Sequence, residues 1–208
     1  MFGQYDLLNI IYTIIALLCA IIPHEIAHGY AAYKLGDDTA KSDGRLSLNP
    51  LNHIDPIGLL SMIIFKFGWA KAVPINPYKF KNRKRDTLIV SLAGVVTNFV
   101  IGFIASLAFV FAYYKSSPVT ELFQSIMWYN VMLGVFNLVP IPPLDGSKAL
   151  ISLFPNKIEY FFYKYERYLY ILLIIALASG TISKVIGPII LGIINKFIDV
   201  GMVLWNTI

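Results

Sequence analysis

Long hydrophobic runs separated by short polar stretches dominate the chain. No charged residue occurs in 7–22, 87–114 or 122–144, and 168–183 and 185–194 are equally apolar. A bilayer core is about 30 Å thick, and a helix needs about 20 apolar residues to cross it. The pattern therefore predicts an all-α polytopic membrane protein with about five transmembrane helices. We expect these helices at 6–35, 87–114, 120–139, 166–181 and 185–205.

The stretch 36–86 has a different character, being polar and rich in turn-forming residues at its start. Asp43-Gly44 is a hairpin-turn dipeptide, which predicts a possible small β-hairpin within 36–56. Residues 57–67 are apolar but too few to cross a bilayer, so we expect a re-entrant or interfacial segment there. Trp69, Tyr78 and a basic cluster follow, as is typical of a membrane–water interface.

The third apolar run ends in "VPIPPLDG", where prolines interrupt the helix, and a short helix follows to about residue 154. No Lys or Arg precedes Lys34, so the first apolar run lacks the basic start of a signal peptide and reads as a retained helix. We found no repeat and no appended PDZ or CBS domain. The expected organisation is one membrane-embedded domain, 1–208, in which 36–86 forms a polar region on the cytoplasmic side.

Composition agrees with this class, because 57% of the residues are hydrophobic, 14% are charged and the mean hydropathy is +0.67. The pI of about 9.2 does not indicate a nucleic-acid partner here, since basic residues in membrane proteins mark cytoplasmic loops. Lys and Arg gather in 79–85 and 148–167, whereas the turn 113–121 holds one Lys. This bias predicts a multi-pass membrane protein with 36–86 and 140–167 in the cytoplasm. The N-terminus then lies outside.

The segment "IIPHEIAHGY" carries the candidate chemistry. His24 and His28 are four residues apart, so on a helix both imidazoles leave one face and can bind one metal ion. Glu25 lies about 100° around the helix, where it can reach a water at that metal without being a ligand. His24 is about 26 Å along the helix from Leu7, at ~1.5 Å per residue, so the motif lies within the membrane towards the cytoplasmic side. Ionisable residues in a membrane span are costly and usually functional.

A catalytic zinc site usually has three protein ligands, so one ligand is missing from this motif. The candidates are Asp145, His53 and Asp55. Asp145 closes the proline-rich break, and irregular backbone at membrane depth is tolerated where it is buried in protein or lines a water-filled cavity. A helix N-cap role is the alternative for Asp145. His53 and Asp55 lie in a polar loop where turn and capping roles are common.

The motifs together resemble the site-2 proteases, which are intramembrane zinc metalloproteases of peptidase family M50. "HEIAH" followed far downstream by "FNLVPIPPLDG" carries the resemblance, and "AGVVTN" at 93–98, "GRLSLNPLNHIDPIG" and "GWAKAVPINP" are similar to the compact prokaryotic branch. The resemblance covers about residues 20–150 and implies a prokaryotic plasma membrane as the location of the protein. The resemblance implies one Zn²⁺ per chain, bound by His24, His28 and Asp145, with Glu25 as catalytic base.

The same resemblance implies roles for two asparagines. Asn137 corresponds to the family's asparagine ahead of the prolines, with a substrate-positioning or oxyanion role, and Asn98 is its counterpart in the "AGVVTN" stretch. Val95 and Ser147 depart from the family's usual proline and glycine, but neither change removes a ligand.

We therefore predict a hydrolase that cuts peptide bonds within or next to transmembrane segments of membrane proteins. Its partners would be a transmembrane substrate and membrane lipid. Because a helix hides its peptide bonds, substrates should carry helix-weakening residues near the cut, and the 36–86 region is expected to hold the unwound strand by edge pairing. The alternatives are a transporter or metal-handling protein, and an inactive protein that binds membrane segments. A transporter should have further ionisable residues along a route across the membrane, and the second and third spans are uncharged.

Overall fold

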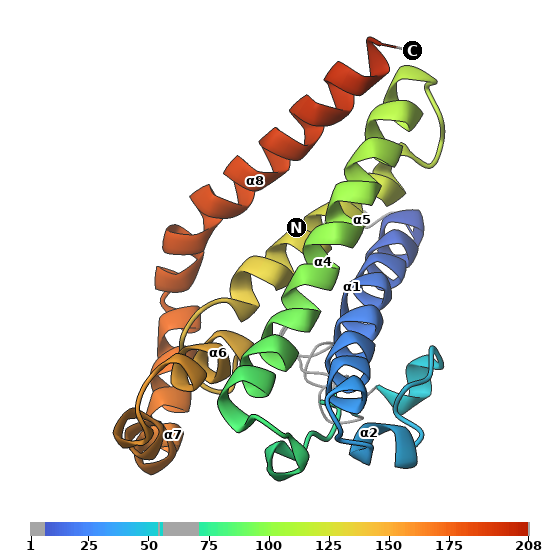
Figure 1. Ribbon diagram of the computed structural model, residues 1–208. Helices are drawn as coiled ribbons and strands as arrows, with labels where there is room; N and C mark the ends of the chain where they lie inside the picture. The colour runs from blue at the N-terminus through green and yellow to red at the C-terminus, as the bar shows by residue number, and fades with distance from the viewer. Residues whose placement is uncertain (1–6, 54, 56–70, 208) are drawn as a thin grey trace.

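A computed structural model describes residues 7–53, 55 and 71–207 of the chain, and in these residues every regular element is a helix (Figure 1). In chain order the elements are α1 (Leu7–Lys34), α2 (Thr39–Ser42), η1 (Pro50–Asn52), η2 (Pro77–Lys79), α4 (Arg83–Tyr114), α5 (Thr120–Asn137), α6 (Asp145–Leu153), α7 (Asn156–Ala178) and α8 (Thr181–Trp205). The predicted all-α class is confirmed for the described part of the chain.

Three of the described helices, α1, α4 and α8, are long and apolar enough to cross a membrane. The predicted number of about five is therefore not confirmed. α5 has 18 residues and includes Glu121, Gln124, Asn130 and Asn137, which lower its hydropathy. α7 begins at Asn156, about ten residues before the predicted start, and its first half carries five charged residues.

α1, α4 and α5 pack side by side in the centre of the molecule, and α8 leans against α4 and α5 (Figure 1). The main hydrophobic cluster joins α4, α5 and α8 through the buried residues Ala105, Met127, Val131, Val135, Ile190 and Ile194. Gly102 allows α4 and α5 to approach closely, because a Cβ there would lie 3.0 Å from a methyl group of Val131. This packing leaves one face of α1 against α4, and that face contains the two motif histidines.

Gly36 ends α1, as the sequence predicts. Its φ of 107° is in the left-handed region, and its N–H bonds to the carbonyl of Tyr33 while the N–H of Asp37 bonds to that of Ala32. These two bonds form a Schellman motif, which satisfies the last carbonyl groups of the helix. Pro23 lies inside α1, and the helix continues past it to Lys34.

The predicted hairpin around Asp43-Gly44 is not found in the described part of 36–56. The short helix α2 occupies this place, and Gly44, with a φ of 65°, ends it as Gly36 ends α1. The N–H groups of Gly44 and Arg45 bond to the carbonyls of Lys41 and Ala40. Asp-Gly therefore serves here as a helix end, because a left-handed glycine suits both a hairpin turn and a Schellman motif. The predicted re-entrant segment, 57–67, lies outside the described residues.

The two ends of the α7–α8 pair lie at opposite ends of α4. Near the start of α4, Arg83 forms an ion pair with Glu159 of α7, and the Lys84 ammonium donates to the carbonyl of Phe154 over 2.8 Å. Near the end of α4, the rings of Tyr114 and Trp205 stack with centroids 5.2 Å apart. α7 and α8 together thus run once along the length of α4 (Figure 1).

Candidate metal centre

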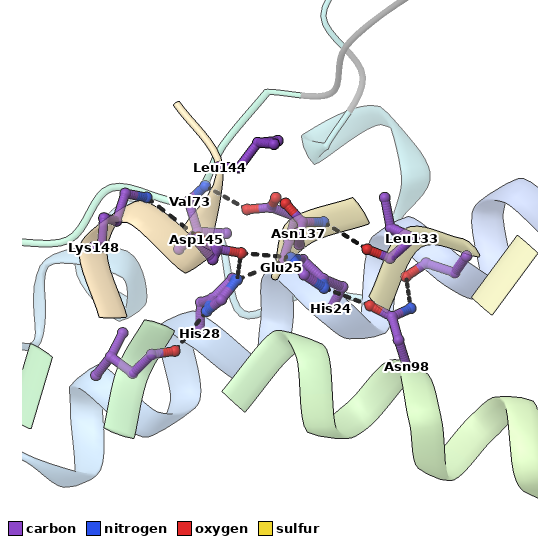
Figure 2. A network of polar contacts seen from close by, with 12 residues as sticks. His24, Glu25, His28, Val73, Asn98, Leu133, Asn137, Leu144, Asp145 and Lys148 are labelled. Atoms are coloured by element: carbon purple, nitrogen blue, oxygen red, sulfur yellow. Dashed lines mark hydrogen bonds and ion pairs between the residues drawn. The ribbon is translucent and has the colours of Figure 1, made fainter. Parts of the chain in front are cut away.

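His24, His28 and Asp145 form a buried cluster in which the three nearest ligand atoms all lie within 4.8 Å of one another (Figure 2). Oδ2 of Asp145 lies 3.1 Å from Nε2 of His24 and 2.9 Å from Nε2 of His28. The two Nε2 atoms are 2.9 Å apart. Four bonds of about 2.0–2.1 Å in a tetrahedron separate the ligand atoms by about 3.3 Å, so the cluster is close to the size that a zinc ion requires.

The outer ring nitrogens explain why these atoms need a cation between them. Nδ1 of His28 donates to the carbonyl of Val90 over 2.7 Å, and Nδ1 of His24 donates to Oδ1 of Asn98 over 2.5 Å. In a neutral imidazole the other nitrogen then carries a lone pair. Two such lone pairs and a carboxylate oxygen converge on one point. A proton can bridge only one pair of these atoms, whereas a divalent metal ion satisfies all three, so the donor set fits zinc.

Asp145 reaches this point because α6 begins directly after the proline-rich break. A Cβ on Gly146 would lie 2.3 Å from the carbonyl oxygen of Leu138, so only glycine lets the start of α6 approach the end of α5 this closely. Asp145 is the first residue of α6, and the N-cap is Leu144, so the N-cap alternative for Asp145 is wrong. Its other oxygen, Oδ1, lies 3.3 Å from the ammonium of Lys148.

The electrostatic surroundings keep Asp145 ionised. The positive charge of Lys148, whose ammonium lies 3.3 Å from Oδ1, stabilises the Asp145 carboxylate. An ionised carboxylate is the form that binds a metal ion.

Glu25 lies beside the cluster and outside it. Its Oε2 accepts a hydrogen bond of 2.8 Å from the backbone N–H of Val73 (Figure 2). The sequence did not point to Val73, because a backbone contact of this kind leaves no signal in residue type.

Buried side chains hold the segment 71–76 over Glu25. The Arg45 guanidinium donates from Nη2 to the carbonyl of Lys71 over 2.6 Å and to that of Ala72 over 3.3 Å. The fully buried carboxylate of Asp37 accepts from the backbone N–H of Asn76 over 2.6 Å. The polar region after α1 therefore places an irregular strand of backbone next to the candidate base.

The two asparagines suggested by the resemblance lie in different surroundings. The Asn98 side chain is fully buried and contacts His24. Asn137, at the end of α5, donates from its amide to the carbonyl of Leu133 over 3.1 Å and is half-buried. Neither contact tests a role in binding substrate, which stays a prediction for both residues.

Among the described residues the cluster does not include His53 or Asp55. His53 is buried, and its Nε2 donates to the carbonyl of Ser47 over 2.7 Å. Asp145 is thus the only one of the three candidates that the fold brings to the two histidines of α1.

Gly94 is a further residue of the centre that residue chemistry alone did not reveal. A Cβ on Gly94 would lie 2.5 Å from Nε2 of His28 and 2.6 Å from Cε1 of His24. It belongs to the "AGVVTN" stretch, so the motif itself was the available signal. The absence of a side chain at 94 lets α4 pack directly on the histidine face of α1.

Comparisons with known proteins identify a family whose model matches most of the chain. The model of "Peptidase family M50" matches residues 12–179. "Putative zinc metalloprotease YwhC" of Bacillus subtilis is 36% identical over 197 residues, covering 91% of this chain and 90% of the relative. "Putative zinc metalloprotease Rip2" of Mycolicibacterium smegmatis is 33% identical over 67% of this chain, which spans 56% of that relative. "Zinc metalloprotease MJ0392" of Methanocaldococcus jannaschii is 27% identical over 70% of this chain and 35% of its own length. No solved structure matches the chain significantly.

Proposed function

The chain belongs to peptidase family M50 and is a zinc metalloprotease of the site-2 protease type, and we propose that it cuts peptide bonds within or next to transmembrane segments of other membrane proteins. One observation carries the assignment of its active site. Two histidines of α1 and the first residue of α6, 117 positions beyond His28, converge on a single buried point beside Glu25. We assign the zinc to His24, His28 and Asp145.

A bound zinc ion at this site supplies a Lewis acid that lowers the pKa of water and polarises a carbonyl group. Contacts from α4 and from within α6 hold the three ligands in position. Val90 and Asn98 of α4 fix the rings of His28 and His24, and Lys148 holds the second oxygen of Asp145. Such supporting contacts orient metal ligands and tune their basicity.

Glu25 is assigned as the general base. The Val73 N–H engages its Oε2 and leaves Oε1 to accept the proton of the attacking water. As the peptide C–N bond breaks, the protonated Glu25 returns this proton to the leaving nitrogen, so the carboxylate is regenerated at the end of the cycle. The hydrogen bond from Val73 also limits rotation of the carboxylate, which keeps it directed at the site.

The substrate strand is proposed to lie beside the segment 71–76. A transmembrane helix hides its peptide bonds, so local unwinding must precede cleavage, and the unwound strand then needs new hydrogen-bond partners. Irregular backbone held by Arg45 and Asp37 offers such partners within reach of Glu25. Asn137, at the end of α5 towards the proline-rich break, is proposed to hold the strand or the developing oxyanion.

Zinc dependence and the need for unwinding predict the outcome of one cleavage assay. Purified protein in bilayers should cut a single-span substrate that has Gly and Pro near the membrane centre at least tenfold faster than a matched substrate with a Leu-Ala span. A zinc chelator should abolish both reactions, and added Zn²⁺ should restore them. Product peptides measured by mass spectrometry give both the rate and the cut site. Cleavage that persists without zinc, or cuts confined to loops far from the bilayer, would contradict the proposal.

A multi-pass arrangement with four crossings is proposed, with the centre nearer the cytoplasmic side of a prokaryotic plasma membrane. α1, α4 and α5 would each cross, and α7 with α8 would cross once, because their outer ends contact opposite ends of α4. Tyr12 near the start of α1 donates to the carbonyl of Pro118 in the α4–α5 turn, so these segments share one side. The basic residues near 79–85 lie at the opposite end, which the positive-inside tendency assigns to the cytoplasm.

Cysteine labelling tests this arrangement. In a Cys19→Ser background, Val119→Cys and Asn206→Cys should react with a membrane-impermeant maleimide on intact cells. Lys81→Cys should react only after the cells are permeabilised. Reaction of Asn206→Cys only after permeabilisation would favour five crossings instead. The accessibility of Lys81→Cys measures the orientation of the 79–85 end in the same experiment.

A further inference from the structure

Asn130 is a fully buried polar side chain in the middle of α5, outside the metal ligands and the motifs that mark them. Its neighbours on the helix, Met127 and Val131, belong to the hydrophobic core. A buried amide among apolar side chains costs free energy unless its hydrogen bonds are made, and an apolar residue would pack there without that cost. Packing alone therefore does not account for an asparagine at position 130.

The hydrogen bonds of Asn130 lead to the metal centre. Its Nδ2 donates to the carbonyl of Ile126 over 2.9 Å, which turns its Oδ1 away from α5. This Oδ1 accepts from Nδ2 of Asn98 over 3.0 Å, and the same Nδ2 also donates to the carbonyl of Ala20 over 2.9 Å. Both protons of the Asn98 amide are thus used, so its Oδ1 faces Nδ1 of His24 at 2.5 Å.

Each hydrogen bond in this network has only one possible assignment of donor and acceptor. The carbonyl oxygens of Ile126 and Ala20 can only accept, so both amide nitrogens must point at backbone oxygens. The Asn130 oxygen then faces the Asn98 amide nitrogen, and the Asn98 oxygen faces Nδ1 of His24. An amide flip at either asparagine would set oxygen against oxygen and lose two hydrogen bonds. The network therefore places the proton of His24 on Nδ1 and leaves Nε2 free as a ligand.

His28 is held in the same form, with its proton on Nδ1, by a single hydrogen bond. Its Nδ1 donates directly to the carbonyl of Val90, and a backbone carbonyl in a helix cannot flip. His24 has a side-chain amide in the corresponding place, which can rotate, and Asn130 supplies the second contact that prevents this. The two histidines thus provide an internal comparison within one site.

We propose that Asn130 is a positioning residue of the metal centre, which acts through Asn98 to hold His24 in its Nδ1-protonated, metal-binding form. This inference rests on the zinc site of the proposed function. It also gives Asn98 a role in addition to the substrate role that the resemblance suggests. Asn98 accepts a hydrogen bond from Nδ1 of His24, the ring nitrogen that does not face the metal position. Loss of supporting contacts of this kind costs metalloproteins about 10–100-fold in metal affinity.

Three variants separate this role from packing. Asn130→Leu removes the acceptor for Asn98, and we expect its zinc affinity to fall about tenfold. Asn130→Asp, as a neutral acid with the shape of asparagine, can still accept from Asn98 and donate to Ile126, so its affinity should return to within about threefold of wild type. Val131→Ala removes buried core volume one residue away without touching the network, and its zinc affinity should not change. Competition with a fluorescent zinc chelator measures the zinc affinity of wild type and of the three variants.

Nitrogen NMR of histidine gives a readout that a purely structural role would not alter. The chain has three histidines, so ¹⁵N-histidine labelling yields six ring nitrogens. In the zinc-loaded wild type, Nδ1 of both His24 and His28 should be protonated and protected from exchange. In Asn130→Leu, only the Nδ1 signal of His24 should shift and exchange faster, while that of His28 stays unchanged.

The outcomes also separate this inference from the function on which it rests. If wild type and Asn130→Leu bind zinc equally well with the same His24 signal, the role of Asn130 is wrong and the proposed function stands. If Asn130→Leu and Val131→Ala lose affinity alike, or the His28 signal shifts with that of His24, Asn130 acts only in packing and the inference is again wrong. If wild type binds no zinc, both proposals fail.

Discussion

Replacing Glu25 by Gln is expected to abolish peptide hydrolysis while leaving the zinc content unchanged. Glu25 is not among the three residues that converge on the metal position. Glutamine keeps the length of the side chain, and its amide oxygen can still accept from the N–H of Val73. It cannot accept the proton of water, however. General bases contribute about 10²–10⁴-fold to rate, so we expect a loss of at least that size in Glu25→Gln.

Zinc analysis and single-turnover cleavage of one membrane substrate check this result, and two further variants serve as controls. Asp145→Asn should lose both zinc and activity, because it removes the charged ligand contributed by α6. His53→Ala should keep its zinc, because His53 lies outside the cluster and contacts Ser47. Equal rates for Glu25→Gln and wild type would remove Glu25 from the role of base. A zinc-free His53→Ala, with zinc retained in Asp145→Asn, would move the third ligand to the loop.

Gly94→Ala is expected to lose zinc binding as well as cleavage, although residue 94 is neither a ligand nor a base. The new Cβ would lie 2.5 Å from Nε2 of His28 and 2.6 Å from Cε1 of His24, closer than real Cβ atoms approach other atoms. Relief requires either that α1 and α4 separate or that both rings turn away from Asp145. A displacement of about 1 Å at a reactive site can cost about 10²-fold in rate, and we expect a loss of at least this size.

Gly192→Ala is the matched control for this prediction, because it makes the same change inside a helix with open space around the new Cβ. It should leave zinc affinity and cleavage unchanged. Alanine favours a helix over glycine by about 1 kcal/mol, so the free energy of unfolding should stay equal or rise. Zinc titration and thermal unfolding of both variants give the comparison. Full zinc affinity in Gly94→Ala would show that α1 and α4 do not meet as described.

Several features were accessible to sequence reasoning because a local pattern encodes them. Long uncharged runs predicted helices at α1, α4 and α8, since length and hydropathy depend only on neighbouring residues. Gly36 predicted the end of α1, and a left-handed glycine ends it. The four-residue spacing of His24 and His28 predicted a shared helix face, and both rings do lie on the face that meets α4.

Other features could not be predicted from the sequence, because the same local pattern is compatible with two different structures. Asp43-Gly44 suits a hairpin turn and a helix end alike, and only the contacts of the surrounding chain select the helix α2. The apolar content of α7 suggested a separate span. Its contacts at Arg83, together with those of α8 at Tyr114, show one passage along α4 for the pair.

By itself the sequence determined the class of protein, the metal-binding pair on α1 and the short set of candidates for a third ligand, because residue type and spacing carry these properties. The family resemblance implied Asp145 among these candidates, and only the tertiary structure shows how Asp145 reaches the histidines. It brings Asp145 to the histidines through the close approach that Gly146 permits, and it leaves His53 bonded to its own loop. It likewise revealed Val73, Gly94 and Asn130. Their contributions are a backbone N–H, an absent side chain and a hydrogen bond two residues removed from the metal, and each depends on the packing of helices far apart in the chain.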